Sequence, residues 1–177
     1  MKNVKMIFYV IIGIILLTLF VGLILPNERK AERTAIFSTS PESIFNLITD
    51  NRNWKWRSNL KEVQILESAG DNEIFKEIQK KGQAITFKVK SKIPYSRYEI
   101  EIIEANGFTG YWTGTLEETD NGGTELTFTE YATIKNPFIK VLSYLFFDLG
   151  STIDQYLGDI AKAIGEEYNK HASDQQK

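Results

Sequence analysis

The chain has 177 residues, of which 42% are hydrophobic and 25% are charged, and its formal net charge at pH 7 is −2. This length suits one domain with an appendage, and the charge gives the chain no general attraction to nucleic acid. The absence of Cys excludes disulfides, thiol nucleophiles and cysteine-ligated zinc or iron–sulfur sites. Because the single His, His171, lies near the C-terminal end, we expect no metal site, no cofactor and no histidine-based catalytic dyad.

Residues 6–25 form an uncharged apolar run, MIFYVIIGIILLTLFVGLIL. At about 1.5 Å per residue, a helix of this length crosses the roughly 30 Å hydrocarbon core of a bilayer. A cleaved signal peptide has a shorter apolar region, usually about 7–15 residues, that ends in small residues. This run ends in LILP, so we favour a retained single-pass membrane anchor. Positive charges flank the run on both sides, so the side of the membrane that holds the remaining chain stays open.

The pattern divides the chain into four parts. We expect an N-terminal transmembrane anchor at 1–26, a short linker at 27–30, a folded domain at 31–170 and a polar tail at 171–177. Because the linker is short and charged, the folded domain is expected to lie close to the bilayer.

The folded part begins with an expected strand at about 31–38. Ser40-Pro41-Glu42 then place a capping hydroxyl, a first-turn proline and an acidic residue where a helix starts. Apolar residues within 44–48 give this short helix one buried face. The stretch 51–59, which carries two Trp residues, predicts a second short helix or a loop.

Six further strands follow, separated by short turns that are rich in Asn, Asp and Gly. The expected strands are 60–67, 73–80, 83–92, 95–104, 108–118 and 124–134. Asn-Gly and Gly-Gly turns between such runs are typical of sequential hairpins. The sequence therefore predicts one antiparallel meander of six strands, or seven with the first.

The spacing of apolar residues becomes helical after Asn136-Pro137. A strongly apolar segment, 138–147, comes first, Gly150-Ser151 interrupts it, and Ser151 with Asp154 offers a capping box for a second helix. A long helix with one apolar face needs a concave partner, and the curved sheet is the surface available. We therefore predict an α+β fold in which an antiparallel sheet wraps around the C-terminal helix.

This order of elements resembles the helix-grip fold of the START-like, or SRPBCC, superfamily. Residues 38–50 (STSPESIFNLITD) are similar to its first-helix signature, and Trp56-Arg57 are similar to the Trp that follows it. Residues 123–127 resemble the turn into the last strand, and 152–157 resemble the start of the long helix in the polyketide cyclase/dehydrase-like branch. The resemblance covers about residues 31–168 and implies a cavity for a hydrophobic ligand between sheet and helix. It implies no particular reaction, because members include lipid carriers, hormone receptors and cyclases.

Strand alternation predicts the side chains that face this cavity. Trp112 should point inward between two glycines that leave room beside it, on the same side of the sheet as Phe128 and Glu130. As a group, the aromatic residues favour a cage for a hydrophobic ligand, although core packing explains any single one of them. The predicted cavity residues are Trp56, Phe87, Tyr98, Trp112, Phe128, Glu130, Leu142, Phe146 and Tyr156.

Glu130 is the clearest candidate for chemistry. An inward carboxylate in an apolar row should have a raised pKa and could act as an acid, a base or an anchor for a ligand. The simpler interpretation, which the sequence alone favours, is a strand-end Glu paired with a nearby Lys or backbone amide.

Two other features each allow two interpretations. The lysines within 88–92 share a predicted outer face, where they could attract anionic lipid headgroups. We favour instead a solvated face whose charge is balanced by glutamates such as Glu73 and Glu77. The apolar segment 138–147 is either a lid over the cavity that touches the membrane or a helix buried on two sides, and both alternatives stay open.

The leading hypothesis is a single-pass membrane protein whose folded domain binds a lipid or another small hydrophobic molecule near the bilayer. One alternative is a cyclase- or dehydratase-like enzyme in which Glu130 acts as acid or base with a tyrosine such as Tyr98. Another is a protein-interaction module that holds no ligand. An open cavity of roughly some hundreds of Å³ would favour the first two over the third.

Overall fold

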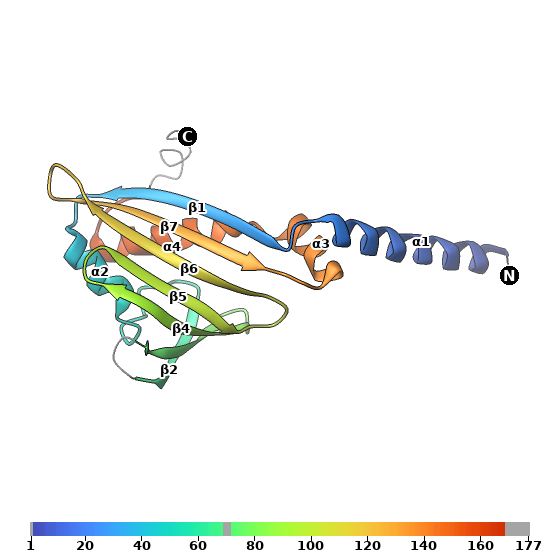
Figure 1. Cartoon of the computed structure of the whole chain (residues 1–177), viewed down its shortest axis with the longest axis horizontal. Coiled ribbons are helices and arrows are strands. Elements are labelled where there is room, and N and C mark those ends of the chain that lie inside the picture. Colours follow the sequence, from blue (N-terminus) through green and yellow to red (C-terminus); the bar gives the residue numbers. More distant parts are fainter. Residues whose placement is uncertain (1, 69–71, 169–177) are drawn as a thin grey trace.

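The computed structural model describes residues 2–68 and 72–168, and the predicted polar tail at 171–177 lies outside this range. Within the described residues, one long helix, α1 (Lys2–Ile24), extends from a domain that combines a seven-stranded antiparallel sheet with three further helices (Figure 1). This confirms the α+β helix-grip fold that the sequence predicts.

The sheet is a meander of six strands, β2 to β7, and the first strand, β1, pairs with β7 at one edge. The order across it is β1-β7-β6-β5-β4-β3-β2, and all neighbours are antiparallel. The strands are β1 (Glu28–Phe37), β2 (Leu60–Glu67), β3 (Ile74–Gln79), β4 (Ala84–Ile93), β5 (Arg97–Glu104), β6 (Thr109–Glu118) and β7 (Thr124–Thr133). The six strands of the meander agree closely with their predicted bounds, because short turns fix where a hairpin begins and ends.

Strand β1 begins at Glu28, earlier than the start near residue 31 that the sequence suggested. Three of the four residues that we assigned to a linker therefore lie in the sheet, where Glu28 pairs with Thr133. The charged side chains of this stretch do not prevent strand formation because they find partners. Arg29, for example, donates hydrogen bonds to the carbonyl oxygens of Ser143 (2.7 Å) and Phe147 (3.0 Å). The boundaries between anchor, domain and tail stay predictions.

Helix α2 (Pro41–Thr49) starts as predicted, with the Ser40 hydroxyl accepting a hydrogen bond from the backbone N–H of Ser43 (3.5 Å). The stretch 51–59 that follows contains turns and no helix, so of the two alternatives it is a loop. Helix α3 (Pro137–Phe146) begins after Asn136, whose side chain caps it.

Helix α4 (Leu149–Ile164) begins earlier than predicted. Its N-cap is Asp148, whose carboxylate accepts a hydrogen bond from the N–H of Gly150 (3.0 Å), and Ser151 lies inside the helix. The predicted capping box of Ser151 and Asp154 is therefore wrong. Asp154 instead accepts a hydrogen bond from Arg33 of β1 (3.1 Å), a contact that local sequence could not indicate. Gly150 leaves the room that this guanidinium occupies.

The main core lies between α4 and the concave face of the sheet. Figure 1 shows α4 crossing behind β1, β7 and β6. Ile153, Leu157 and Ile160 on α4 are fully buried against sheet residues that include Leu126 and Phe128. Burial of this helix face is the main stabilising contact between the two layers.

Candidate functional site

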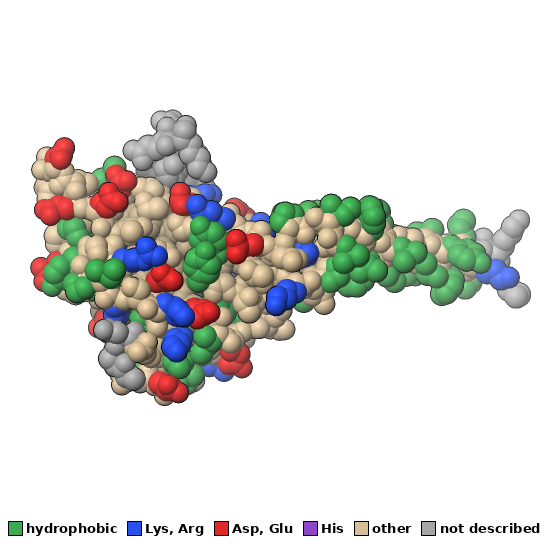
Figure 2. All heavy atoms as spheres, in the orientation of Figure 1, with side chains coloured by type: hydrophobic (Ala, Val, Ile, Leu, Met, Phe, Trp, Pro, Cys, Tyr) green, Lys and Arg blue, Asp and Glu red, His purple; other side chains and the backbone are tan. Residues whose placement is uncertain are grey.

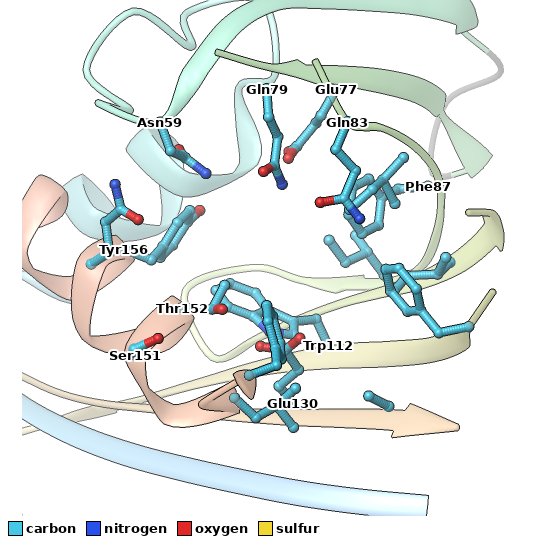
Figure 3. A pocket seen from close by; sticks show the side chains of 18 of the residues that line it. Asn59, Glu77, Gln79, Gln83, Phe87, Trp112, Glu130, Ser151, Thr152 and Tyr156 are labelled. Atoms are coloured by element: carbon cyan, nitrogen blue, oxygen red, sulfur yellow. The ribbon is translucent and has the colours of Figure 1, made fainter. Parts of the chain in front are cut away.

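A cavity of about 790 Å³ lies between α4 and the inner face of the sheet and reaches α3 (Figure 3). Its walls combine apolar side chains of β3 to β7 with residues of α3, α4 and the 51–59 loop. This volume falls within the range of about 300–1,000 Å³ that is typical of small-molecule sites.

Seven of the nine predicted cavity residues line this space. They are Phe87, Tyr98, Trp112, Glu130, Leu142, Phe146 and Tyr156. Strand alternation located the sheet residues among them because the inner face of each strand is continuous with the core.

The other two predicted residues, Trp56 and Phe128, support the wall from behind. Trp56 packs edge-on against Tyr156, with 5.3 Å between ring centroids. Phe128 stacks on Trp112 at 4.7 Å, and it fits there because Gly114 has no side chain to exclude its ring. Both residues therefore position aromatic rings that do line the cavity.

The sequence did not identify the polar end of the cavity. Arg57, which is half-buried, donates a hydrogen bond to the buried Glu77 (3.0 Å) at the cavity wall and also lies above the ring of Tyr156. The expectation that Glu77 lies on a solvated face is wrong. Alternation along β3 could have indicated this, because Glu77 follows the buried Phe75 by two residues and therefore lies on the same inner face of the strand. Asn59, Gln79 and Gln83 lie at the same end (Figure 3), and Asn51 also lines the cavity.

Tyr98 and Tyr156 place two hydroxyl groups in the cavity wall. Burial raises the pKa of each above its ordinary value, so both are protonated at neutral pH. The amide of Asn51 donates hydrogen bonds to the Tyr98 hydroxyl (3.2 Å) and to the carboxylate of Glu73 (2.9 Å). Glu73, which we expected on a solvated face, is also buried.

Glu130 lies away from this polar end, beside Trp112 (Figure 3). Burial raises the pKa of its carboxyl to about 7, although the Trp112 indole N–H and the Arg29 guanidinium favour the ionised form. Its side chain is only 9% exposed, and the Oε2 atom has no hydrogen-bond partner among the described residues. This environment differs from a strand-end Glu paired with Lys, and it leaves an acceptor available to a bound molecule.

Part of the cavity wall is formed by exposed side chains of α3. Leu142 and Phe146 line the cavity although their side chains are 54% and 79% exposed. Helix α3 is therefore not buried on two sides, and the interpretation as a lid that touches the membrane stays a prediction.

The lysines of β4 do not form the expected common outer face. A register shift between Val89 and Ser91 places Lys92 opposite Tyr98, on the inner side of the sheet. Its ammonium group donates a hydrogen bond to the carbonyl of Thr49 (3.1 Å), while Lys90 pairs with Glu101 on the outer face. Such a bulge adds one residue and reverses the alternation beyond it. Within residues 2–68 and 72–168, no cluster of three acidic or imidazole side chains is placed to hold a metal ion.

Comparison with known proteins gives a family and a fold. The family model described as polyketide cyclase / dehydrase and lipid transport matches residues 28–164. No curated protein matches the chain. Among solved structures, a START superfamily protein from Mycobacterium smegmatis is similar with a TM-score of 0.62 and 15% identity, over 77% of this chain and 97% of that one.

Two enzymes have the same fold. The Zhui aromatase/cyclase from a Streptomyces species is similar with a TM-score of 0.61 and 11% identity, over 77% of this chain and 96% of that one. Norcoclaurine synthase from Thalictrum flavum, in complex with dopamine and hydroxybenzaldehyde, is similar with a TM-score of 0.64 and 13% identity, over 81% and 90%. At these identities the likeness concerns the fold, and the fold hosts both binding and catalysis.

Proposed function

The chain belongs to the polyketide cyclase / dehydrase and lipid transport family, and we propose that it binds a lipid or another small hydrophobic molecule in its cavity while α1 holds it to a membrane. The observation that carries this proposal is the cavity of about 790 Å³ between sheet and α4. A molecule that fills such a space gains about 25 cal/mol for each Å² of apolar surface removed from water.

The polar groups of the cavity support an elongated, amphipathic ligand. Arg57 with Glu77 lies at one end, Glu130 lies apart from them, and the wall between is largely apolar and aromatic. A few placed polar groups in an apolar site fix the orientation of a ligand. The free Oε2 of Glu130 suits a hydroxyl or ammonium group that donates to it.

The membrane attachment is supported by α1. Residues Val4–Ile24 have a mean hydropathy of 3.0 and are long enough to cross a bilayer, a test that a signal sequence also passes. Retention is favoured by Lys140, a buried lysine whose ammonium group donates to the carbonyl of Leu25 (3.0 Å) and to the side chain of Asn27 (2.6 Å). Cleavage after residue 25 would leave part of this buried charge without its acceptors.

The proposal is tested by identifying what the full-length chain carries. We would purify the chain in a mild detergent and measure bound small molecules by native mass spectrometry. The matched variants are Ala132→Phe, which fills the cavity, and Thr133→Phe, which is next to it on β7 but on the other face. Lipid that merely surrounds α1 is the same in all three proteins.

We expect a defined hydrophobic species near one molecule per chain in the parent and in Thr133→Phe, and several-fold less in Ala132→Phe. Equal amounts in all three folded proteins, or an empty parent, would contradict binding in the cavity. An empty parent would favour a protein-interaction module instead.

A second candidate function is an enzyme of cyclase or dehydratase type, and the pKa of Glu130 near 7 favours it. A carboxyl that titrates near neutral pH can both accept and donate a proton. The predicted pairing with Tyr98 has less support, since the hydroxyl of Tyr98 is bonded to Asn51. Once the bound species is known, mass spectrometry of its conversion by the parent and by Glu130→Gln decides between carrier and enzyme.

A further inference from the structure

Helix α3 exposes a set of large apolar side chains at the end of the domain from which α1 departs. We call this set the α3 apolar surface. It consists of Phe138, Leu142, Leu145, Phe146 and Phe147, whose exposed fractions range from 40% to 79%. Figure 2 shows hydrophobic side chains along α1 and on the adjoining part of the domain. A contiguous apolar patch of this kind marks a contact with a membrane or a partner.

The position of α3 relative to α1 is fixed by direct contacts. The backbone of Pro137 lies so close to Gly22 that no side chain would fit between them. Lys140 bonds to Leu25 and Asn27 just beyond the last turn of α1. Because Gly22 belongs to the apolar run of α1, α3 starts at the level where that run reaches the edge of the hydrocarbon core.

The polar residues of α3 face away from the α3 apolar surface. Lys140 and Ser143 are buried in the junction, where Ser143 also accepts from Arg29. The helix is therefore amphipathic, and its apolar side continues the apolar surface of α1. Interfacial helices lie in the plane of the bilayer with such a side buried among headgroups and acyl chains.

We propose that α3 lies in the surface of the bilayer that α1 spans, so that the mouth of the cavity opens to lipid. This inference rests on the proposed function and specifies its ligand class. Leu142, Phe146 and Phe147 both line the cavity and belong to the α3 apolar surface. A molecule that passes between them moves from acyl chains to cavity wall without crossing water.

The ligand class that fits this geometry is a lipid of the bilayer itself. Each CH₂ group that enters water on the way to a protein costs about 0.8 kcal/mol, so long-chain molecules leave a bilayer slowly unaided. A cavity opening that lies within the bilayer removes this cost for every carbon of the lipid's acyl chain. A water-soluble substrate gains nothing from such a mouth.

The depth of α3 is measured with the full-length chain in vesicles of phosphatidylcholine and phosphatidylglycerol. Because the chain has no Cys, a single Cys at Leu145→Cys accepts an environment-sensitive NBD label at one site. Asp120→Cys, in the exposed turn between β6 and β7, is the matched control. We expect a blue-shifted NBD emission and quenching by doxyl-labelled lipid at residue 145, at least about threefold stronger than at residue 120. The same emission and quenching at both sites would overturn the proposal.

The route of the ligand is measured with dibromostearate, which quenches a Trp that it contacts. The part of the quenching that is present in the parent and absent in Trp112→Phe comes from Trp112. Because Trp112 lines the cavity, this part reports the arrival of dibromostearate there. Leu145→Glu alters the α3 apolar surface without altering the cavity wall, and Ile93→Glu changes a similarly exposed residue of β4. We expect Leu145→Glu to slow the quenching at least tenfold with the same final level, and Ile93→Glu to leave the rate unchanged.

An unchanged rate of quenching in Leu145→Glu would overturn the route through α3.

The proposal of binding in the cavity and the proposal of α3 in the bilayer surface fail separately. A deep label at residue 145 without any quenching of Trp112 would contradict binding in the cavity but keep the placement of α3. Quenching of Trp112 together with an NBD label at residue 145 that reports water would support binding in the cavity but contradict the placement of α3 in the bilayer.

Discussion

Two buried carboxylates of the cavity, Glu77 and Glu130, have different partners and therefore different chemistry. Glu77 is bonded to Arg57, so its charge is compensated inside the protein. Among the described residues, the Trp112 indole and the Arg29 guanidinium are the groups that favour the charge of Glu130, and burial raises its pKa to about 7. We conclude that Glu77 has a structural part in the wall, whereas Glu130 is the carboxylate that a ligand can influence.

The raised pKa of Glu130 predicts how stability depends on pH. Its pKa lies near 4.5 in the unfolded chain and near 7 in the folded one, so between these values the folded state binds more protons. Stability therefore falls as pH rises through this window. Glu130→Gln removes the buried charge, and we expect it to be about 3 kcal/mol more stable than the parent at pH 8 and equal to it well below pH 4.5.

Denaturation of the full-length chain in detergent micelles, followed at several pH values, checks this expectation. The control is Glu117→Gln, which changes an exposed carboxylate of β6 and should leave the pH profile unchanged. A parent and a Glu130→Gln variant with parallel profiles would show that the carboxyl titrates at its ordinary value.

At the scale of elements, α3 connects α1, the sheet and the cavity. Its buried Lys140 bonds to Leu25 and Asn27 just beyond α1, and carbonyl groups at its C-terminal end accept from Arg29 of β1. A cation at a helix C-terminus is favourable because the carbonyl groups there carry partial negative charge. Helix α3 is therefore held by charged side chains on one side and leaves its apolar side uncovered.

Lys140→Met should loosen the junction between α1 and the domain. The substitution keeps the length of the side chain but leaves the Leu25 carbonyl and the Asn27 amide without their donor, a loss of about 1–3 kcal/mol. We expect hydrogen exchange at residues 25–30 to become about tenfold faster or more in nanodiscs. The exposed Lys135→Met is the control, and equal exchange in both variants would mean that Lys140 does not fasten the junction.

The elements that the sequence predicted well are those that local rules determine. Hairpin turns set the strand bounds, and alternation placed Tyr98, Trp112 and Glu130 on the inner face. Alternation gives the face of a residue but not its depth, so Phe128 was assigned to the cavity although Trp112 covers it.

The features that the sequence missed depend on contacts between distant segments. The pair of Arg57 and Glu77 joins a loop to β3, and the contact of Arg33 with Asp154 joins β1 to α4. The bulge near Lys90 depends on the pairing of β4 with β5 and leaves no distinct local pattern. The polar end of the cavity was therefore beyond local sequence patterns.

For the whole molecule, the direct passage from α1 into β1 would set the distance between the domain and the bilayer that we propose α1 spans. Only residues 25–27 separate the end of α1 from Glu28, the first residue of the sheet. With α1 in a bilayer, as proposed, the domain would have little freedom to move away, and the α3 apolar surface would stay at high effective concentration beside the lipid.

A flexible insertion at this passage tests its importance. We expect about ten Gly and Ser residues, inserted between Asn27 and Glu28, to slow dibromostearate quenching of Trp112 roughly three- to tenfold, because the effective concentration falls as the tether lengthens. The same insertion between Asn121 and Gly122, in the turn between β6 and β7, should have no effect. Equal rates in both insertions would show that the domain finds the bilayer without a short tether.

The pairing of β1 with β7 also determines the order of events during synthesis. Helix α1 and β1 leave the ribosome before β7, but Glu28 pairs with Thr133 and Phe37 with Thr124 in this last strand of the sheet. At about 5–20 residues per second, translation takes roughly 5–20 s to supply β7. For that time β1 has no partner strand, and its free edge is open to other strands. The sheet therefore closes late, by joining its first strand to its last, and the nascent chain is most exposed to aggregation in this interval.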